Sequence, residues 1–401
     1  SLKFTIRKNM SKGWRFENTE REYLNEVLAS GFTAGSTGSM NERLEKEFAR
    51  IHNQKYAITA NSGTSTLHMA LYSFGVTAGD EVIVPTLTPA MSGFAVWQCC
   101  GAIPVFADVK QDTFLIDPAD IVKKITPKTK AIMPVHLYGL MCDMDAIMEI
   151  AKKYNLYVIE DSAQCFLAFD NKKRMSGTVG DVGSWSFENS KHVSAGDGGI
   201  VTSDSEELAT KMRQFGGVGF KNINAANGKV RISRDLFQDP NWTRHNIMAY
   251  NYRLPELCAA VALAQVENIK KFVELRQLMG NSYRKTIIDS NTDILIPQFV
   301  PENFIHSYYT FGALFNGKKY GIEWQEFRKK YMEMGGDGIY AACQTLNNEP
   351  AFKNNKIGRG EVPTAENLQK NLMQFTANQK NEEERKVQIN ALEKTLKFFR
   401  N

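Results

Sequence analysis

The sequence predicts an α/β fold, in which a mostly parallel sheet carries helices on both faces and a smaller α+β domain follows. Two observations predict this fold class. Short apolar runs alternate with helical patterns over the first half of the chain, an order typical of parallel sheets. The runs are also nearly continuous, as strands covered on both faces require. The 401 residues suit two domains, which we place at residues 1–265 and 266–401.

Seven apolar runs are the predicted strands. Helical patterns lie in three of the six intervals between successive runs, which indicates a largely parallel sheet. The runs lie at residues 56–58, 81–85, 103–106, 131–135, 156–159, 184–187 and 199–202.

Helical patterns fill the segments between and after the strands. One opens at Asp117 and Pro118, a cap followed by proline at the first helical position. A long pattern starts near Pro255, ends near Gly280 and is expected to bridge to the second domain. The other expected elements are helices at 18–50 (broken by a glycine-rich stretch at 31–38), 64–74, 118–125, 144–154, 324–334 and 382–399, and a strand at 308–315.

Composition narrows the function classes. The 49 basic and 44 acidic residues give a net charge of +5, too mild over this length to predict nucleic-acid binding. The sequence has no 18-residue apolar run and no signal-peptide pattern, so we expect a cytoplasmic protein without a membrane span. Six cysteines without a CxxC pair or a metal-ligand spacing favour buried thiols in a reducing compartment and no metal site.

Candidate functional residues follow the strands, because ligands of open α/β sheets bind at the carboxyl ends of the strands. The hydroxyl-rich turn 61–66 opens a helix, so its backbone at Gly63 and Thr64 is a candidate phosphate site, with a simple helix cap as the alternative. The turn 160–164 places Asp161 at a strand end. Its partner there is either the pyridine nitrogen of pyridoxal phosphate (PLP), which a carboxylate keeps protonated, or a helix N-terminus.

A third turn, residues 186–199, places Lys191 among hydroxyl groups and glycines between two apolar runs. Most lysines are solvated, but a lysine in a turn between buried strands is partly desolvated. Such an amine can form a Schiff base. A fourth turn, residues 250–254, is polar and aromatic, and by itself it indicates only aromatic packing.

The order of these turns is more specific than any one of them. A phosphate turn, a carboxylate, a lysine 30 residues further on (191 minus 161) and Asn-Tyr-Arg at 251–253 closely resemble the fold-type I PLP aminotransferases of the DegT/StrS sugar aminotransferase family. That family lies in the aspartate aminotransferase superfamily, and the resemblance runs from about Gly31 to Gln277. Further matching segments are residues 79–85, 104–109, 136–139 and 143–147.

The resemblance implies a role for each residue of the turns. Lys191 would carry PLP as a Schiff base and, once freed, would move the proton during amino transfer. Asp161 would pair with the pyridinium nitrogen, and Gln164 would bond to the ring hydroxyl.

The phosphate group of PLP would be held by residues from two chains. Ser186 and the backbone at Gly63 and Thr64 are the ligands implied within one chain. Asn251 would reach the phosphate from a partner subunit. The resemblance therefore implies a homodimer with shared active sites.

Two positions depart from the family pattern. Pro89 stands where the family usually has an aromatic residue that stacks on the cofactor, and it would cover the ring with less surface. Glu188 stands where an aromatic residue or histidine is common. A related dehydratase group has histidine in place of the PLP lysine; Lys191 occupies that position here and His192 only follows it, which favours amino transfer.

The predicted function is amino transfer from L-glutamate to a keto-sugar. A nucleotide-linked keto-deoxysugar for surface polysaccharide or glycan biosynthesis is the leading substrate. The alternatives are a free, octulosonate-like keto-sugar acid, a PLP sugar dehydratase and, in another class, a non-catalytic regulator of the same fold. The intact set of Lys191, Asp161 and Gln164 argues against the regulator.

Three less familiar segments are candidates for substrate contacts. The irregular loop 215–247 is expected to bind a diphosphate or a carboxylate or else to be a solvated surface. Segments 336–340 and 347–350 either line the mouth of the substrate site or are ordinary turns. The basic residues of the loop are Lys221, Lys229, Arg231, Arg234 and Arg244.

Overall fold

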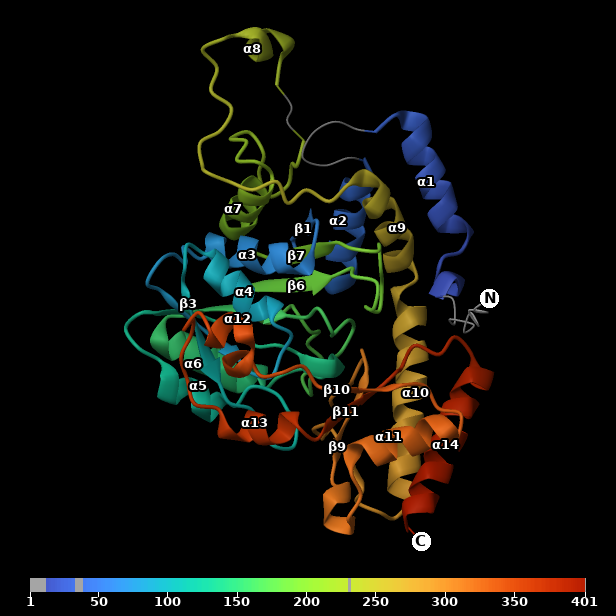
Figure 1. Cartoon of the computed structure of the whole chain (residues 1–401). Coiled ribbons are helices and arrows are strands. Elements are labelled where there is room, and N and C mark those ends of the chain that lie inside the picture. The colour runs from blue at the N-terminus through green and yellow to red at the C-terminus, as the bar shows by residue number, and fades with distance from the viewer. Residues whose placement is uncertain (1–11, 33–38, 230–231, 401) are drawn as a thin grey trace, which may run out of the picture.

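The computed structural model describes residues 12–32, 39–229 and 232–400 (Figure 1). The first 11 residues, Arg231 and most of the glycine-rich stretch expected at 31–38 lie outside the described residues. A seven-stranded sheet and a four-stranded sheet form the centres of two parts of the molecule. The long helix α10 (Ile269–Asp289) runs from the first part into the second.

The larger sheet contains all seven predicted strands. They are β1 (Tyr56–Ala60), β2 (Glu81–Pro85), β3 (Ile103–Ala107), β4 (Thr129–Ile132), β5 (Tyr157–Asp161), β6 (Val182–Ser186) and β7 (Gly199–Ser203). Their order is β1-β7-β6-β5-β4-β2-β3. β7 is antiparallel to both of its neighbours and the other pairs are parallel, so the predicted mostly parallel sheet is confirmed.

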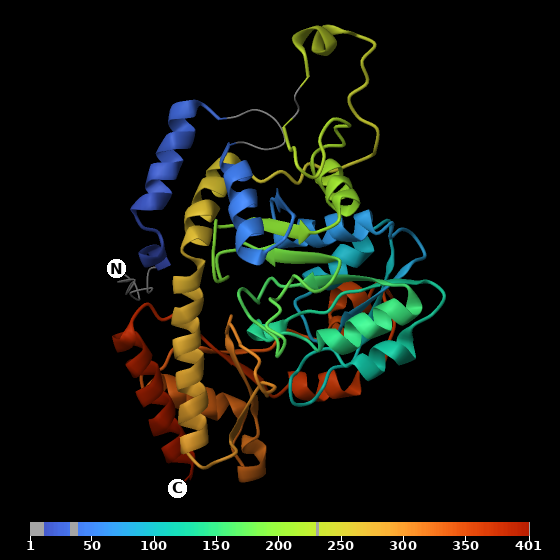
Figure 2. The ribbon, with the colours of Figure 1, turned by 180° about the vertical axis from the view of Figure 1, so that it is seen from behind.

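Helices flank this sheet on both faces. They include α1 (Asn18–Ser30), α2 (Ser39–His52), α3 (Gly63–Ser73), α4 (Met91–Gln98), α5 (Pro118–Lys124), α6 (Met144–Tyr154), α7 (Glu206–Gly216) and α9 (Glu256–Glu267). Successive residues of a strand point to opposite faces. In β7, Ile200 packs into a buried cluster with α2 and α9, whereas Val201 packs into one with α3 and α7. Figure 2 shows α1 and α2 beside α9 from behind.

The helix expected from Pro255 to Gly280 is in fact two helices, so that prediction is wrong in detail. α9 ends at Glu267 and α10 begins at Ile269, because Asn268 between them leaves the helical conformation, with φ −103° and ψ 11°. The Asn268 side chain donates to the carbonyl oxygen of Ala264 at 3.0 Å, a local bond that competes with regular helix geometry.

Gly280 does not end the second of these helices, which continues to Asp289. A Cβ atom at Gly280 would lie 2.3 Å from Cγ of Tyr308, so this glycine allows a close approach instead of marking a stop. Tyr308 itself has a left-handed φ of 48°, and the strand expected from residue 308 begins only at Phe311.

The smaller part is an α+β unit, as predicted. It contains β8 (Leu295–Pro297), β9 (Phe311–Phe315), β10 (Ile339–Ala341), β11 (Leu372–Phe375), α11 (Trp324–Glu333) and α14 (Glu382–Arg400). The sheet is antiparallel in the order β10-β11-β9-β8. Tyr283 of α10, Phe327 of α11 and Leu392 of α14 belong to its buried cluster.

Part of the C-terminal sequence packs against the larger sheet. Leu346, Phe352 and Leu368 belong to the same buried cluster as β2 and β3. Arg359 donates two hydrogen bonds to the carboxylate of Glu81, at 2.9 and 2.7 Å. Helices α12 (Pro350–Lys353) and α13 (Pro363–Gln369) therefore lie with the large sheet, and the domain division at residues 265 and 266 stays a prediction.

Residues 232–248, here called the arm, project from the body of the molecule (Figure 1). The short helix α8 (Arg234–Gln238) within the arm contains no buried residue. Arg244 lies over the rings of Phe237 and Trp242, with 4.8 and 5.3 Å to their centroids. The arm covers the second half of the irregular loop expected at 215–247, whose first residues instead end α7.

Candidate active site

The carboxyl ends of three strands bring the candidate turns to one edge of the sheet. Gly63 begins α3 after β1, Asp161 ends β5 and Ser186 ends β6. β5 and β6 are parallel neighbours, and β1 runs in the same direction because β7 is antiparallel to both β1 and β6. These three turns therefore share the edge at which ligands of such sheets bind.

The two neighbouring carboxylates at the end of β5 have different surroundings. Glu160 is fully buried, and its Oε1 accepts the N–H groups of Val179 and Gly180, both at 2.6 Å. Its Oε2 accepts the N–H of Gly177 at 2.8 Å and lies 2.7 Å from Nε2 of His136. Glu160 therefore holds the loop between β5 and β6 and has no free oxygen for a ligand.

Asp161 is also buried, at 6% exposure, but it has fewer partners. Its Oδ2 accepts the Ser92 hydroxyl at 2.9 Å and its Oδ1 accepts the Ala163 N–H at 3.1 Å. Burial raises the pKa of Asp161, although these two bonds and the positive charge of Lys191 act against the rise. Within the described residues Asp161 has no ion pair, so a cationic ligand at this carboxylate would offset its desolvation.

Gln164 lies three residues after Asp161 in the sequence, in the wall of a small cavity. Its Oε1 accepts the backbone N–H of Tyr138 at 2.9 Å, which fixes the amide orientation. The cavity wall also contains Pro89, Cys343 and Gln374, the last two from the C-terminal third of the chain. The edge of the large sheet therefore faces side chains of the later segments here.

The phosphate turn is tightly packed. Ser62 caps α3, because its hydroxyl accepts the N–H of Ser65 at 3.0 Å. A Cβ atom at Gly63 would lie 2.7 Å from Cβ of Ser186, so only glycine allows the helix start to approach β6 this closely. The first amides of α3, at Gly63 and Thr64, have no carbonyl partner within the helix. Thr64 is half-buried at this helix start.

The turn that carries Lys191 is held by two buried arginines from distant parts of the sequence. Arg15 donates to the carbonyl oxygens of residues 189, 191 and 192, at 3.2, 2.9 and 2.7 Å. Arg276 of α10 donates to those of residues 190 and 191, at 2.9 and 3.2 Å. Burial lowers the pKa of Arg15 to about 10 and that of Arg276 to about 9. Four consecutive carbonyl groups thus have guanidinium partners.

The side chains around Lys191 come from the turn itself and from the smaller part. Nζ of Lys191 lies over the ring of Tyr309, 4.5 Å from its centroid. His192 is fully buried, its Nε2 lies 2.8 Å from the carbonyl oxygen of Ser307, and burial lowers its pKa well below the usual range. A neutral ring bonded to the backbone agrees with His192 having no catalytic duty. Glu188 accepts the N–H of Ser190 at 2.9 Å.

The side chain of Asn251 is exposed, and its Oδ1 accepts Nε of Arg253 at 2.9 Å. The carbonyl of the next residue, Tyr252, accepts the N–H of Asn61 at 2.8 Å, so the backbone here borders the phosphate turn. The segments 336–340 and 347–350 lie near β11 and at Thr86, respectively.

Four residues of the site were not predicted from the sequence: Ser92, Arg15, Arg276 and Tyr309. Only Arg276 carried a usable signal: it lies four residues after Phe272 and three before Met279, on the apolar face of the expected helix. A charged residue on such a face requires a buried partner. The partners of Arg15 lie about 175 positions away in the chain, a relation that local patterns do not encode.

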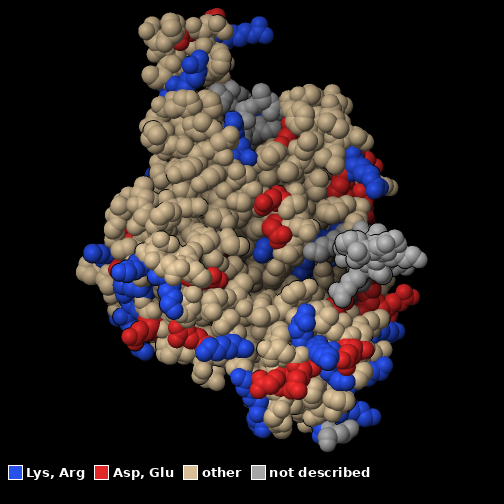
Figure 3. Space-filling model, viewed as in Figure 1, with Lys and Arg blue, Asp and Glu red and all other residues tan. Residues whose placement is uncertain are grey.

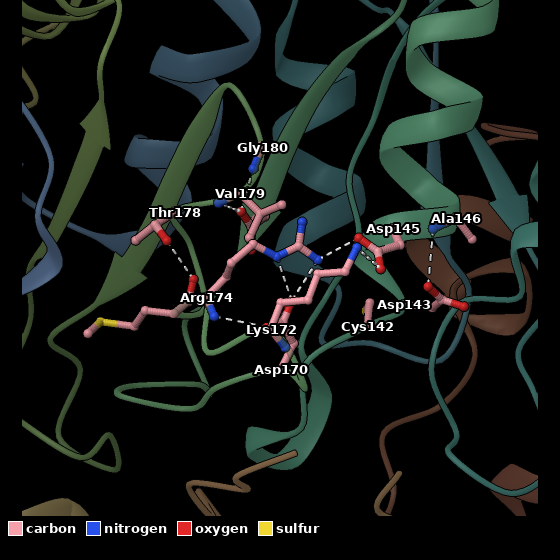
Figure 4. Close-up of polar contacts among 12 residues, drawn as sticks. Cys142, Asp143, Asp145, Ala146, Asp170, Lys172, Arg174, Thr178, Val179 and Gly180 are labelled. Atoms are coloured by element: carbon pink, nitrogen blue, oxygen red, sulfur yellow. Dashed lines mark hydrogen bonds and ion pairs between the residues drawn. The ribbon is translucent and has the colours of Figure 1, made fainter. Parts of the chain in front are cut away.

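A surface cleft of about 250 Å³ lies apart from all the predicted site residues, next to the loop between β5 and β6. Its charged groups pair with one another: Arg174 donates to Asp145 and Asp170, and Lys172 pairs with Asp145 (Figure 4). Among the described residues no group of three or more His, Cys, Asp or Glu is arranged for a metal ion.

Comparison with known proteins identifies relatives of this chain. The model of the DegT/DnrJ/EryC1/StrS aminotransferase family matches residues 15–391. A GDP-perosamine synthase of Escherichia coli O157:H7 is 39% identical over 268 residues, which cover 67% of this chain and 68% of that protein.

Solved structures show the same fold. An aminotransferase from Psychrobacter cryohalolentis superposes with a TM-score of 0.86 at 28% identity, covering 96% of this chain and 98% of that one. The sugar aminotransferase fold also recurs in Spr1654 of Streptococcus pneumoniae, solved in a PMP form, with a TM-score of 0.81 and 21% identity over 96% and 98% of the two chains.

Proposed function

The chain belongs to the DegT/DnrJ/EryC1/StrS aminotransferase family, and we propose that it moves the amino group of L-glutamate to a nucleotide-linked keto-sugar with PLP as cofactor. The family resemblance predicted from the four turns is confirmed by the match over residues 15–391. We further propose the identity of the sugar, its nucleotide and the amino donor, and the roles of the individual residues.

The substrate proposal depends on one observation, the 39% identity to a GDP-perosamine synthase over two thirds of both chains. We take a GDP-linked keto-sugar as the acceptor, for surface polysaccharide or glycan biosynthesis. The free keto-sugar acid and the dehydratase remain outcomes that the test below distinguishes. The six free cysteines agree with the predicted cytoplasmic location. Among the described residues no helix is long and apolar enough to cross a membrane.

The residues at the sheet edge fit PLP. The buried carboxylate of Asp161 suits a protonated ring nitrogen, because it lacks any ion pair among the described residues and burial raises its pKa. The start of α3, packed against Ser186 at a position that admits no Cβ, suits a phosphate group. Gln164 has its amide orientation fixed by Tyr138 and can donate through Nε2 to the ring hydroxyl.

Bound PLP would supply an electron sink that stabilises negative charge at the carbon losing its proton. The chain supplies the rest. Lys191 would bind the cofactor covalently through Nζ and, when free, would move the proton between two carbon atoms. Asp161 keeps the ring nitrogen protonated, and the arginine-held turn keeps Nζ of Lys191 in place while it acts. Pro89 covers one side of the cavity at Gln164.

A homodimer with shared active sites is part of the proposal. The exposed side chain of Asn251 supports it, since a phosphate ligand that faces solvent can serve a second chain. Figure 3 shows few charged side chains near α3, α7 and the base of the arm, whereas charges of both signs cover the smaller part. Exposed apolar side chains in this region, Met91, Trp97 and Tyr250, also favour a protein interface.

The test is a visible absorbance spectrum of the PLP-loaded protein during two half-reactions. We expect L-glutamate to remove the yellow band with release of α-ketoglutarate, and a GDP-linked keto-sugar to restore it. UDP-linked sugars and a free keto-sugar acid serve as competing acceptors. A band that glutamate leaves unchanged would overturn the donor, restoration only by the free acid would overturn the substrate, and consumption of sugar without α-ketoglutarate would indicate the dehydratase.

A further inference from the structure

We propose that Tyr309 is a positioning residue for Lys191: its ring face holds the free ammonium group, and the chain Glu188–Ser190–Tyr309 fixes the ring. This inference rests on the proposed function only in assigning chemistry to Lys191. It assigns a purpose to Glu188, one of the two residues that depart from the family pattern.

The backbone of Tyr309 is anchored beside the Lys191 turn. Its carbonyl oxygen accepts a hydrogen bond from Arg276, the same side chain that donates to the carbonyl of Lys191. Tyr309 and Lys191 therefore share one rigid partner on α10. Nζ of Lys191 lies 4.5 Å from the ring centroid, within the range of a cation–π contact.

The phenol group is oriented by the other two residues. The Ser190 hydroxyl contacts a carboxylate oxygen of Glu188, and its Oγ also lies 2.8 Å from the Tyr309 hydroxyl. An ionised carboxylate only accepts, so the single Ser190 proton goes to Glu188. The proton between Ser190 and Tyr309 must then come from Tyr309. This order, Tyr309 to Ser190 to Glu188, anchors the phenol oxygen of the ring whose face lies below Nζ.

The charges nearby explain why an aromatic ring suits this position. Arg15 and Arg276 already place two buried cations at the turn, and among the described residues Lys191 has no carboxylate partner in an ion pair. A carboxylate in contact would keep the amine protonated and unreactive. A ring face stabilises the ammonium by a factor of only about 2 to 30.

The experiment measures the reactivity of Lys191 in the full chain without cofactor or substrate. The protein is treated with a trace of acetic anhydride from pH 6 to 11, and mass spectrometry compares acetylation of Lys191 with that of Lys285, an exposed lysine on the same helix as Arg276. Because the neutral amine reacts, we expect Tyr309→Leu to increase the Lys191 signal about 3- to 10-fold near pH 8.

The pH profile separates this effect from a simple gain in access. Loss of the ring face moves the midpoint of the profile to lower pH and leaves the plateau at high pH unchanged, whereas a more open site raises the plateau itself. Tyr309→Phe keeps the ring face but loses the hydroxyl group that bonds to Ser190, so its signal should lie between those of the wild type and Tyr309→Leu. Glu188→Gln and Ser190→Ala break the same chain, so each should resemble Tyr309→Phe, and their effects should not add to each other.

Two results would overturn the proposal: a Tyr309→Leu profile with an unchanged midpoint, or a Tyr309→Phe variant as reactive as Tyr309→Leu. Circular dichroism of each variant checks the fold. Because the measurement includes neither PLP nor sugar, its outcome does not depend on which sugar accepts the amino group. If the acetylation profiles are as expected but the GDP-linked keto-sugar is not the acceptor, only the proposed substrate fails. If that sugar is the acceptor but the profiles are not as expected, only the proposal for Tyr309 fails.

Discussion

Two irregular segments of this chain carry arginines, yet they are held in opposite ways. In the Lys191 turn, Arg15 and Arg276 are buried and donate to four consecutive carbonyl groups. In the arm, Arg244 donates a solvent-exposed bond to the carbonyl of Phe237 and stacks on rings that are themselves partly exposed. The Lys191 turn is fixed by buried side chains, whereas the arm bonds to its own chain at its last residues, where the backbones of Arg244 and Asn246 pair with those of Lys221 and Gly219.

The difference shows which segment is held in place by buried hydrogen bonds within one chain. A buried guanidinium without a carboxylate partner is costly unless its donors are all used, and the Lys191 turn uses them on backbone that would otherwise lack partners. The arm leaves Leu236, Phe237 and Met248 exposed by 38%, 49% and 93%. We infer that the turn is complete in one chain, while the arm is completed by a second copy. Four predictions test this contrast.

The largest effect is expected at Lys191 itself. Lys191→Ala removes the group that binds PLP covalently and moves the proton, so amino transfer should fall by a factor on the order of 10⁴ or more. The glutamate half-reaction, followed by absorbance, measures it. Lys285→Ala is the matched control, because Lys285 is exposed and, among the residues described, pairs with Asp289 alone. Normal cycling of Lys191→Ala would remove this lysine from the mechanism.

The second prediction concerns the buried carboxylate. Asp161→Asn keeps the shape and an oxygen that can accept from Ala163, but it replaces the oxygen that accepts from Ser92 with a donating NH2 group and loses the negative charge. The half-reaction should slow by about 10²-fold or more, because a charge aimed at the ring nitrogen is lost. Unaltered kinetics would mean that Asp161 does not face the cofactor.

The same variant should make the cofactor-free chain more stable at neutral pH. Burial raises the pKa of Asp161, so the folded carboxyl binds its proton more tightly than the unfolded one. The wild type then loses stability as pH rises from the ordinary value, about 3.9, through the raised value. Melting midpoints of the two proteins should therefore differ above this window and converge below it. Equal midpoints at every pH would contradict the raised pKa.

The third prediction compares arginines in the two segments. Arg15→Lys retains the charge but cannot reach three carbonyl groups, so unfolding by urea should show a loss of about 2 kcal/mol. Arg244→Lys in the arm should change the same quantity by less than about 0.5 kcal/mol, since its contacts are partly solvated. Similar losses in both variants would show that the two segments are held alike.

The sequence predicted the sheet and its edge well, because both follow from local patterns. Seven apolar runs and three polar turns are each encoded within about ten residues, and the fold that connects them is widely shared. The break at Asn268 and the close contact at Gly280 were not predictable in this way, since each depends on a specific neighbour. The surroundings of Lys191 depend on Arg15 and Tyr309, which lie more than 100 positions away on either side.

The smallest effect is expected in the arm, and it should appear in assembly more than in folding. Phe237→Ser removes an exposed ring from α8, a helix with no buried residue, so the unfolding free energy should stay within about 0.5 kcal/mol of the wild type. If a second copy covers this ring, the dimer should dissociate at about 10-fold higher protein concentration, as measured by sedimentation equilibrium. Phe398→Ser is the matched control, because that ring is similarly exposed at 52% but lies on α14, far along the chain from the arm. Weakened assembly in the control alone would place the interface on the smaller part, and a marked loss of stability from Phe237→Ser would mean that its own chain already holds the arm.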